Sequence, residues 1–587
     1  MSQQVATKKL INEVSNCERE CNEGLVAVHP GLSLVDGETV VVRSDAADVT
    51  AANKVILISG GGSGHEPGHA GYTGKGMLTA SACGSVFASP PPKCIMAAVD
   101  AACGQNKNCA VMMIVTNYTG DRLNFGIACE RARVKGHQTE MIVVGEDCAL
   151  DSVDHSAGRR GLAGTMFIHK IAGAMAEQGM GLAEMTSELN KIKSRMGTMG
   201  VSLSPCSVPG SGPNFTLQPD EMELGLGVHG EAGVKRIKVL SAKETVRTMM
   251  DHMTNPQSST HIDVSSGDRV ALMVNNLGGT SVLELNIVAK EAIEYLERRG
   301  VSVERAYCGT YMTSLEMAGV SITVLHIDDR IRAFLDFPTD APGWKSCYLP
   351  PGATVRITPP LVKVQLDDQI LSDAGAGKLD AAASALVYKS IKHVCERLVS
   401  SEAHLNDLDT QSGDGDCGST VARGARAILS KLGSAEQPGL PVDCPLTLAL
   451  RLGQIAEDTM GGSSGALYSL FFTGASQELK TLTADSLAKA VDSGLKALMK
   501  YGGAKPGQRT MIDPIDAASK SLSQNSQLSL SEAVKVAAKA SEAMAQSTAG
   551  MDAQAGRASY VNKELLTKPD PGAVAVAMWM TAIADAL

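Results

Sequence analysis

Three aspartates separated by glycines are the strongest chemical signal in the sequence. Asp409, Asp414 and Asp416 lie within eight residues, and Gly413 and Gly415 stand between them. The glycines let the backbone turn, so that the three carboxylates can converge. Carboxylate oxygens at this density suit Mg²⁺, which also takes phosphate oxygens and keeps part of its water shell. The segment therefore predicts a metal site that binds phosphate.

Two other interpretations of this acidic segment are a solvated turn and a calcium loop of the EF-hand type. The calcium loop is excluded because the glycines and Cys417 break its ligand spacing. Its twelfth position, counted from Asp409, holds Thr420 where a glutamate is needed. The solvated turn stays open on composition alone.

A second glycine-rich turn, residues 460–466 (MGGSSGA), lies between two segments with helical periodicity. Backbone N–H groups at a helix N-terminus, with the hydroxyls of Ser463 and Ser464, can form an anion site, although packing explains such turns equally well. It is not a Walker A sequence, since no Gly-Lys-Ser/Thr follows. Arg557 would supply positive charge to a transferring phosphoryl group. Three more short polar loops between helical segments are Gly507–Asp513, Gly556–Tyr560 and Asp570–Ala573.

The first half of the chain has a glycine-rich loop, Gly60–Pro67, directly after an apolar run. Glycines at the C-terminal end of a parallel strand place backbone amides against a ligand at the edge of the sheet. A dinucleotide-binding turn is excluded, because His-Glu-Pro interrupts the helix N-terminus that it needs. The loop therefore predicts a small-molecule site.

Two titratable residues follow later in the same half. Asp121 either N-caps the helix that follows it or acts as a general base toward a substrate hydroxyl. His229 has glycines close on both sides, so a ligand can approach it, whereas a lone histidine is more often structural. Residues 275–280 (NNLGGT) supply another small-residue loop at a comparable edge.

Short apolar, β-branched runs alternate with helical patterns in the first part of the chain, which predicts an α/β domain with buried strands. A Gly/Ser/Pro-rich stretch, Ser202–Pro213, is interpreted as the crossing between two subdomains. The strand candidates are Val55–Ser59, Ala110–Thr116, Met141–Gly145, Val270–Asn275 and Ser321–Ile327.

The sequence changes character after residue 338, where a Pro/Gly-rich stretch is followed by small residues. We expect an α/β domain at residues 9–345, a linker at 346–384 and an all-α domain at 385–587. Strand signals nearly vanish in the last part. Its helix candidates are Ala385–Ser400, Leu446–Met460, Ala484–Tyr501 and Leu530–Thr548.

Composition fits a multidomain globular protein, with 587 residues, 44% of them apolar and 20% charged. Only 3% are aromatic and the formal charge is −10, which argues against direct nucleic-acid binding. No apolar stretch reaches the ~18 residues that cross a bilayer, and no signal sequence follows the start, so we expect no membrane partner. The 14 cysteines show no Cys/His spacing of a zinc site, which favours reduced thiols and a cytoplasmic location.

Taken in order, these motifs resemble those of the single-chain dihydroxyacetone kinases over nearly the whole sequence. GGGSGHEP, NYTGDRLNF, ELGLGVHGEAG and NNLGG are similar to the sugar-binding domain of that family. LDTQSGDGDCG, MGGSSGALY, GQRTMID, GRASY and DPGA are similar to its nucleotide domain, which is a helical barrel. Nine motifs in one order are far more specific than any one of them.

The resemblance implies that His229 attacks the ketone carbon of dihydroxyacetone and holds it as a covalent hemiaminal. Such chemistry would select a carbonyl compound over glycerol. Asp121 would remove the proton from the hydroxyl that is phosphorylated, and glyceraldehyde would be a second substrate. The implied substrate-binding residues are Gly61, Gly62, Ser63, Gly64, His65, Thr116 and Asp121.

For the nucleotide domain, the resemblance implies two Mg²⁺ ions held on ATP by Asp409, Asp414 and Asp416. Animal members also cleave FAD to AMP and riboflavin cyclic 4′,5′-phosphate, a reaction for which Mn²⁺ or Co²⁺ is a further candidate. A homodimer is implied, and a cytosolic antiviral RNA-helicase sensor is a candidate partner. The implied nucleotide-binding residues are Asp416, Cys417, Gly418, Ser419, Ser463, Ser464, Thr510, Met511, Arg557, Asp570, Pro571 and Gly572.

One position departs from the family pattern. Microbial members usually have Lys before Asn-Tyr-Thr-Gly-Asp, and this chain has Thr116, which keeps a hydroxyl but loses a cation. Weakened sugar-kinase activity is expected, with less effect on FAD cleavage. Two alternatives stay open: a kinase-like binding or regulatory protein, and a lyase that acts on FAD alone. The sequence also leaves open whether the active site forms within one chain or across a dimer.

Overall fold

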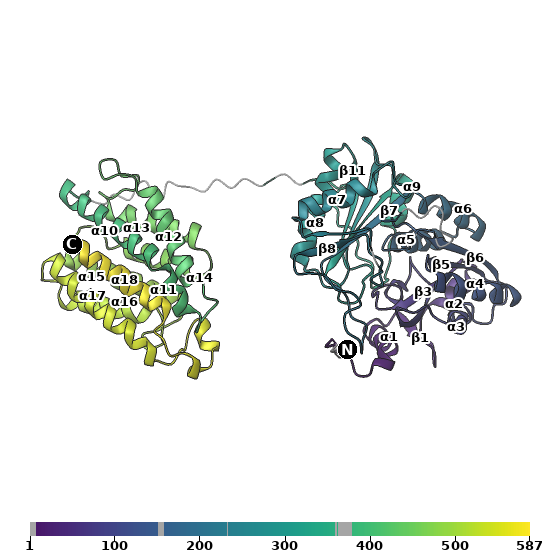
Figure 1. Ribbon diagram of the computed structural model, residues 1–587, viewed down its shortest axis with the longest axis horizontal. Helices are drawn as coiled ribbons and strands as arrows, with labels where there is room; N and C mark the ends of the chain where they lie inside the picture. The colour runs from purple at the N-terminus through teal and green to yellow at the C-terminus, as the bar shows by residue number, and fades with distance from the viewer. Residues whose placement is uncertain (1–6, 151–157, 232, 359–360, 362–377) are drawn as a thin grey trace. The chain divides into compact units, whose positions relative to one another are not determined.

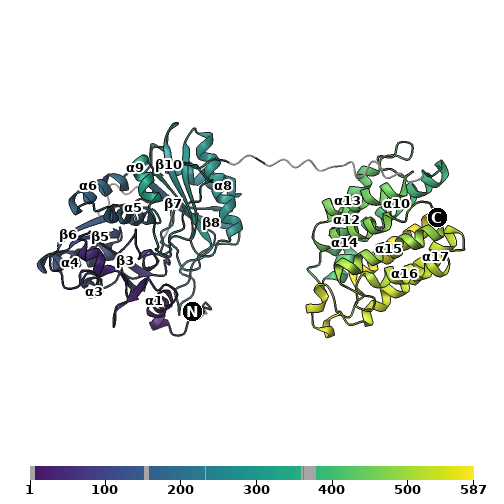
Figure 2. The same ribbon diagram turned by 180° about the vertical axis from the view of Figure 1, so that it is seen from behind.

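The computed structural model describes residues 7–150, 158–231, 233–358, 361 and 378–587. The chain divides into two compact units, Met1–Pro360 and Leu361–Leu587, which Figures 1 and 2 show from opposite sides. This boundary falls within the predicted linker, of which residues 359–360 and 362–377 lie outside the described residues. The second unit begins with helix α10, whose first residue is Ala381, slightly before the predicted start of the all-α domain.

The first unit contains two six-stranded sheets, and the first of them has the strand order β1-β2-β4-β3-β5-β6. Strands β4, β3, β5 and β6 are parallel to one another, whereas β1 and β2 are antiparallel to their neighbours. The parallel strands are apolar along most of their length because both faces of the sheet are covered. The bounds are β1 Leu32–Leu34, β2 Val40–Arg43, β3 Ile56–Ser63, β4 Ala80–Val86, β5 Ala110–Thr116 and β6 Gln138–Val144.

The second sheet has the order β11-β10-β12-β7-β8-β9 and is antiparallel except for the β10–β11 pair. The interpretation of Ser202–Pro213 as the crossing between subdomains is wrong, because β7 already pairs with β12 and β8 in this sheet. That stretch instead connects two neighbouring strands. The bounds are β7 Met196–Ser202, β8 Glu221–Leu224, β9 Lys235–Lys238, β10 Arg269–Asn276, β11 Ser302–Gly309 and β12 Gly319–His326.

Helices separate and cover the two sheets (Figure 1). One apolar core joins β3, β5 and β6 of the first sheet to β10 and β12 of the second through α5, α6 and α9. Helix α5 is buried over Thr165–Ala176, as expected for a helix that is apolar all round. Helices α3 and α4 cover the other face of the first sheet, and α7 and α8 that of the second. The bounds are α1 Cys17–Val28, α2 Ala46–Ala51, α3 Pro92–Cys103, α4 Thr119–Val134, α5 Thr165–Glu177, α6 Leu182–Lys193, α7 Ala242–Met253, α8 Val282–Arg298 and α9 Asp329–Asp336.

The second unit is a closed ring of helices. Each of α12 to α18 packs against the next along the chain, and α10 closes the ring by packing against both α12 and α18. The predicted fold class, an α/β part followed by an all-α helical barrel, is confirmed. The bounds are α10 Ala381–Ser400, α11 Glu402–Asp409, α12 Cys417–Leu432, α13 Pro445–Met460, α14 Gly462–Ser476, α15 Ala484–Gly502, α16 Ile512–Gln524, α17 Leu530–Ser547 and α18 Pro571–Ala586.

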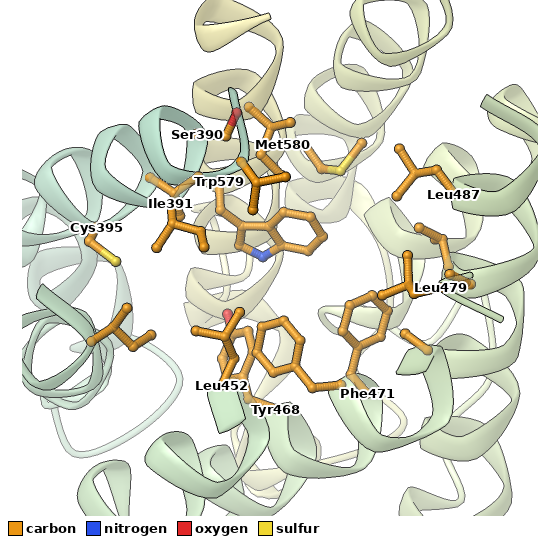
Figure 3. A pocket seen from close by; sticks show the side chains of 18 of the residues that line it. Ser390, Ile391, Cys395, Leu452, Tyr468, Phe471, Leu479, Leu487, Trp579 and Met580 are labelled. Carbon is orange, nitrogen blue, oxygen red and sulfur yellow. The ribbon is translucent and has the colours of Figure 1, made fainter. Parts of the chain in front are cut away.

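The barrel interior holds an apolar cavity of about 290 Å³ (Figure 3). Trp579 projects into it from α18, and Tyr468 and Phe471 face it from α14. Glycines allow some of these helices to approach closely, since a Cβ on Gly494 of α15 would lie 2.7 Å from the backbone oxygen of Phe471 on α14. No helix among the described residues is long and apolar enough to cross a membrane.

Candidate functional site

His229 lies in the loop between β8 and β9, and the side chain of Glu231 fixes its orientation. The His229 Nδ1 is 2.8 Å from Oε1 of Glu231, and the His229 backbone N–H donates to Oε2 at 3.0 Å. Burial would raise the pKa of Glu231, but the hydrogen bonds from His229 outweigh it and hold the pKa at about 2. The carboxylate is therefore ionised and accepts the Nδ1 proton, which leaves the Nε2 lone pair as the nucleophilic position.

His65 faces this lone pair from the loop after β3. Its Nδ1 donates to the carbonyl oxygen of Thr313 at 2.8 Å, and its Nε2 lies 3.2 Å from Nε2 of His229. Burial, followed by the nearby His229, lowers the pKa of His65 to about 3. The Nε2 of His65 is therefore an acceptor, 3.2 Å from His229, for a group that donates a hydrogen bond between the two rings.

Two aromatic rings line the His229 side chain. The ring of Phe87 stacks on that of His65, with 5.1 Å between the ring centroids, and meets the His229 ring edge-on at the same centroid distance. The ring of Tyr118 also meets the His229 ring edge-on, with 4.7 Å between the centroids. These two rings narrow the path by which a ligand can reach Nε2 of His229, and neither places a charged group beside it.

Asp121 is the third residue of α4, and Tyr118 occupies the N-cap position. The interpretation of Asp121 as a helix N-cap is therefore wrong. Its side chain is buried, and among the described residues its Oδ1 has no hydrogen-bond partner. Burial raises the pKa of Asp121 to about 6, although the nearby His229 lowers it. A buried carboxylate oxygen without a donor is costly unless a ligand supplies one.

The glycines of the Gly60–Pro67 loop have a structural role as well. Strand β3 continues through them to Ser63, and a Cβ on Gly62 would lie 2.6 Å from the backbone nitrogen of Ala88. Gly61 is buried beside His69, and the Ser63 hydroxyl donates to the carbonyl of Gly84 at 2.8 Å. Close strand packing is thus sufficient to explain these glycines.

Gly64, next along the chain, has a φ of +98°, which favours glycine, and its amide points at the carboxylate of Glu66 at 3.0 Å. Thr116 is buried at the end of β5, two residues before the His229 neighbour Tyr118. The end of β5 therefore does lie next to the histidine pair.

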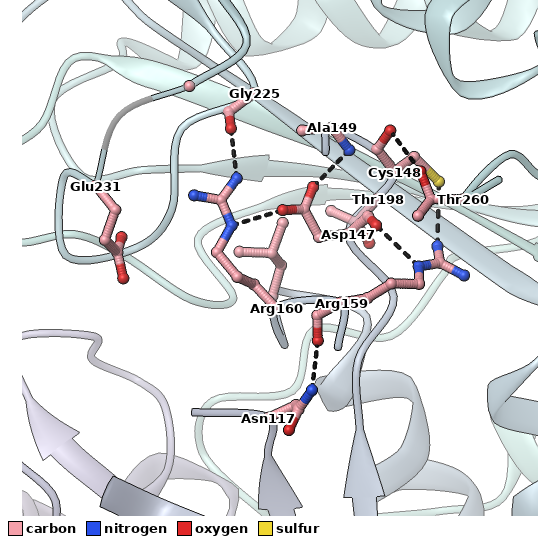
Figure 4. A network of polar contacts seen from close by, with 12 residues as sticks. Asn117, Asp147, Cys148, Ala149, Arg159, Arg160, Thr198, Gly225, Glu231 and Thr260 are labelled. Atoms are coloured by element: carbon pink, nitrogen blue, oxygen red, sulfur yellow. Dashed lines mark hydrogen bonds and ion pairs between the residues drawn. The ribbon is translucent and has the colours of Figure 1, made fainter. Parts of the chain in front are cut away.

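A polar network supports the His229 loop from behind (Figure 4). The Arg160 Nε donates to Oδ2 of buried Asp147 at 2.7 Å, and its Nη2 donates to the carbonyl oxygen of Gly225 at 2.5 Å. The adjacent Arg159 instead binds the backbone of residues 146–147 and, through its own carbonyl, the side chain of Asn117. Arg160 is the member of this network that contacts the strand end leading into His229.

The three aspartates of the acidic segment converge as predicted. One carboxylate oxygen from each of Asp409, Asp414 and Asp416 lies within 4.8 Å of those of the other two. Asp409 ends α11, and its Oδ2 accepts the backbone N–H groups of Asp416 and Cys417 at 3.1 and 3.2 Å. An all-oxygen donor set at this spacing fits Mg²⁺.

Four helix N-termini meet around these carboxylates in a cleft of about 390 Å³. These helices are α12, α14, α16 and α18. The residues at or next to their first positions that line the cleft are Cys417, Ser463, Met511 and Pro571. Unpaired amides and the helix dipoles give each N-terminus a partial positive charge. The cleft therefore holds carboxylates that can bind a cation and helix N-termini that can bind an anion. A metal–phosphate complex requires both.

Arg509 adds a buried cation to this cleft. Its side chain is 1% exposed, and among the described residues its Nε and Nη1 have no hydrogen-bond partner. Nη1 lies 4.0 Å from Oδ2 of Asp570, the N-cap of α18. Burial raises the pKa of Asp570 to about 6, which Arg509 partly opposes. These unpaired guanidinium donors suit an anionic ligand.

The cleft brings together most, but not all, of the residues expected to bind nucleotide. Gly418 and Ser419 do not line it, and Ser419 instead binds Asn406 through its amide and hydroxyl. The side chain of Arg557 lies outside what the structure describes. The residues of the expected set that line the cleft are Asp416, Cys417, Ser463, Ser464, Thr510, Met511, Asp570, Pro571 and Gly572.

Three functional candidates were missed from the sequence. Glu231 stands two residues after His229 within a motif already singled out, so a His-x-Glu spacing could have revealed it. Arg509 and Arg423 each line the cleft, and Arg423 holds the carbonyl end of α13 through Thr459 at 2.6 Å. Arg509 stands within the GQRTMID motif already singled out, whereas nothing in the spacing of Arg423 separates it from exposed arginines.

Comparisons with known proteins agree with this architecture. The Dak1 domain matches residues 23–343 and the DAK2 domain residues 411–585. The chain is 46% identical to triokinase/FMN cyclase of Homo sapiens, covering 99% of this chain and 100% of that protein. It is 38% identical to dihydroxyacetone kinase of Citrobacter freundii over 93% of this chain and 92% of that protein.

A crystal structure of the C. freundii kinase in complex with AMP-PNP and Mg²⁺ superposes with a TM-score of 0.69 at 33% identity, covering 99% of this chain and 100% of that one. The chain belongs to the dihydroxyacetone kinase family.

Proposed function

We propose that this chain phosphorylates dihydroxyacetone and glyceraldehyde with ATP and, at the same nucleotide cleft, cleaves FAD to AMP and riboflavin cyclic 4′,5′-phosphate. The observation that carries the proposal is the pairing of two distinct chemistries in one chain. One is an imidazole whose nucleophilic nitrogen is fixed by Glu231, and the other is a carboxylate cluster facing four helix N-termini. Relatives named for both activities support it.

In the sugar site, Nε2 of His229 would attack the carbonyl carbon. A C–N bond forms, the C=O π electrons move to oxygen, and that oxygen takes a proton from solvent to become the hemiaminal hydroxyl. The positive charge left on the His229 ring would be balanced by the Glu231 carboxylate. This hydroxyl can donate to the lone pair of His65 Nε2, which is neutral and 3.2 Å from His229. This hydrogen bond would stabilise the covalent adduct.

Asp121 would act as the general base. Its carboxylate takes the proton from the terminal hydroxyl while that oxygen forms a bond to the γ-phosphorus of ATP and ADP leaves. A pKa of about 6 suits this role, since the group is ionised near pH 7 yet basic enough to accept a proton.

In the cleft, Asp409, Asp414 and Asp416 would hold Mg²⁺, which when bound neutralises phosphate charge; Mn²⁺ or Co²⁺ is the further candidate for FAD cleavage. The N-termini of α12 and α14 and the guanidinium of Arg509 would orient the phosphates. With FAD, a ribityl hydroxyl would attack the flavin-side phosphorus, the bond to AMP would break, and the hydroxyl proton would leave with the products. That reaction needs no outside acceptor and no residue of the sugar site.

The test is to incubate the purified chain with Mg-ATP and dihydroxyacetone, and separately with FAD. We expect ADP and cyclic riboflavin phosphate, respectively. His229→Ala should abolish the first product and keep the second, while Asp414→Ala and Asp416→Ala should abolish both without unfolding the chain. The absence of ADP above a buffer control would overturn the kinase proposal, and FAD cleavage alone would support the lyase alternative.

We further propose a homodimer in which the sugar site of one subunit uses the nucleotide cleft of the other. Mixing His229→Ala with Asp414→Ala subunits tests this. If sites form across subunits, a mixed dimer pairs one intact sugar site with one intact cleft and regains kinase activity. If each site forms within one chain, the mixture stays inactive.

A role as a binding protein is the second candidate, and Thr116, in place of the usual lysine, is the observation that favours it. The candidate partner is then a cytosolic antiviral RNA-helicase sensor. Retained partner binding by an inactive Asp414→Ala variant, together with negligible turnover by the unmodified chain, would favour this role over catalysis.

A further inference from the structure

The fold assembles a thiol–imidazole cluster that no spacing in the sequence reveals. Cys103 is the last residue of α3, Cys109 directly precedes β5, and His137 directly precedes β6. Strands β5 and β6 are parallel neighbours with Ala110 opposite Gln138, so the residues before them are brought side by side. The cysteines show no zinc-site spacing in the sequence, yet the fold brings two of them together with a histidine.

This cluster lies at the opposite end of the first sheet from the sugar site. Cys109 and His137 stand at the beginnings of β5 and β6, and Cys103 lies beside them at the end of α3. His65 and Tyr118 instead follow the carboxyl ends of β3 and β5. In parallel sheets these two edges are separated by the full strand length. The cluster therefore cannot take part in chemistry at His229.

The ligand atoms are close and buried. One sulfur from each cysteine and one ring nitrogen of His137 all lie within 4.8 Å of one another, and the residues are 2%, 5% and 7% exposed. The His137 Nδ1 accepts the backbone N–H of Cys109 at 3.3 Å, so a lone pair of the ring is turned toward that residue. A metal ion bound at Nδ1 would take the place of this hydrogen bond.

The ligand types also suit a metal. Two thiols and one imidazole are held together by the fold. Because only thiolates bind a divalent cation, such an ion would displace both thiol protons.

We propose that Cys103, Cys109 and His137 bind one Zn²⁺ ion, with water as the fourth ligand. Two sulfurs and one imidazole are a ligand set that zinc favours, whereas Mg²⁺ prefers the all-oxygen cluster of the second unit. Binding transfers two thiol protons to solvent and leaves a locally neutral site. The ion would tie the 104–108 loop to the starts of β5 and β6, at the edge of the sheet away from His229.

The test is a Co²⁺ titration of the reduced full chain, because cobalt occupies zinc sites and thiolate ligands give it a strong near-ultraviolet charge-transfer band. The carboxylate cluster gives no such band, and excess Mg²⁺ in the buffer occupies it so that it does not take up cobalt. Cys17 and Cys21 lie one turn apart on α1 and Cys21 is exposed, so the titration uses a Cys17→Ser/Cys21→Ser background. We expect the band to saturate at one equivalent and to disappear when Zn²⁺ is added.

Variants assign the band to the cluster. Cys103→Ser and Cys109→Ser should lose it, and His137→Gln should weaken cobalt binding. Cys129→Ser, which changes another buried free cysteine on α4, is the matched control and should keep the band. The proposal is overturned by no band in the background protein, by a band that survives Cys109→Ser, or by equal loss in Cys129→Ser.

A measurement on the background protein covers the case in which the variants fail to fold. Zn²⁺ should raise its thermal unfolding midpoint, and Mg²⁺ at the same concentration should not reproduce the shift. Intact-mass analysis under non-reducing conditions should show both thiols free. A Cys103–Cys109 disulfide in the purified chain, or no zinc-specific shift, would count against the site.

Discussion

The carboxylate of Glu231 lies 2.8 Å from Nδ1 of His229, on the opposite side of the ring from the nitrogen that faces His65. This contact decides which imidazole nitrogen carries the proton and therefore which one can attack a carbonyl. The second carboxylate oxygen of Glu231, Oε2, accepts a hydrogen bond from the backbone N–H of His229. One side chain thus fixes the tautomer and the loop together.

Glu231→Gln should lower kcat/KM for dihydroxyacetone about 100-fold, since the amide no longer requires a proton on Nδ1. FAD cleavage should be unchanged because it does not use the sugar site. NMR with C2-labelled dihydroxyacetone provides a direct readout: the tetrahedral carbon signal of the adduct should weaken in the variant. An unchanged adduct signal with unchanged kinetics would remove Glu231 from this role.

The pH dependence of the kinase reaction should report Asp121. Burial raises its pKa to about 6, so the carboxylate is protonated below that pH and cannot accept the substrate proton. We expect kcat/KM to fall as pH drops through about 6 and to level off above it. Asp121→Asn should abolish the kinase reaction at every pH.

Asp570 has a raised pKa in the same range and lies in the nucleotide cleft, so the two groups must be separated. FAD cleavage is the internal control, because it uses the cleft without Asp121. If FAD cleavage shows the same fall near pH 6, the titration belongs to the cleft. A fall confined to the kinase reaction assigns it to Asp121.

The parts of the fold and of the site that can be predicted from the sequence are those whose residues lie close together along the chain. The apolar runs of β5 and β10 and the aspartates of residues 409–416 carry their information within a few positions, and the structure places them as expected. The meeting of Cys109 with His137 depends on strand pairing across the sheet, which no local pattern encodes. Ser202–Pro213 was misread because a composition typical of a domain crossing equally suits a long connection between neighbouring strands.

The absence of a side chain at Gly413 should matter for Mg²⁺ binding by the three aspartates and not for the stability of the fold. A Cβ at this position would lie 2.4 Å from Oδ1 of Asp409, so Gly413→Ala must displace one of the three carboxylates. We expect the Mg²⁺ concentration for half-maximal activity to rise at least about tenfold for both reactions. The unfolding midpoint without metal should change little.

Gly550→Ala is the matched control, because Gly550 has no atom within 4 Å of an added Cβ. It should leave the Mg²⁺ dependence unchanged. If Gly413→Ala behaved like this control, the arrangement of Asp409 would not matter for metal binding.

Arg509→Lys should raise KM for ATP by about tenfold and weaken FAD cleavage as well. The guanidinium is buried with Nε and Nη1 lacking protein acceptors in the described part of the chain, and a lysine cannot offer two donors in that geometry. Arg426→Lys is the control, since Arg426 makes an exposed ion pair with Glu402. Equal effects of both substitutions would mean that the change in KM does not come from the cleft.

Arg160 should affect the kinase reaction only by positioning the loop that carries His229. It joins Asp147 to the carbonyl of Gly225 at the start of the His229 loop (Figure 4). Arg160→Lys keeps the charge but cannot make both contacts, so we expect kcat for dihydroxyacetone to fall about tenfold. FAD cleavage and the pH at which kcat/KM falls should both be unchanged, because neither the nucleotide cleft nor Asp121 is altered.

Arg159→Lys separates loop positioning from general damage to the network. Arg159 belongs to the same cluster and its side chain binds the carbonyls of Glu146 and Asp147, whereas the contact with Gly225 belongs to Arg160. It should lower the unfolding midpoint about as much as Arg160→Lys while leaving kcat near normal. If both variants lost kcat in proportion to their loss of stability, Arg160 would be a structural residue only, and the orientation of His229 would depend on Glu231 alone.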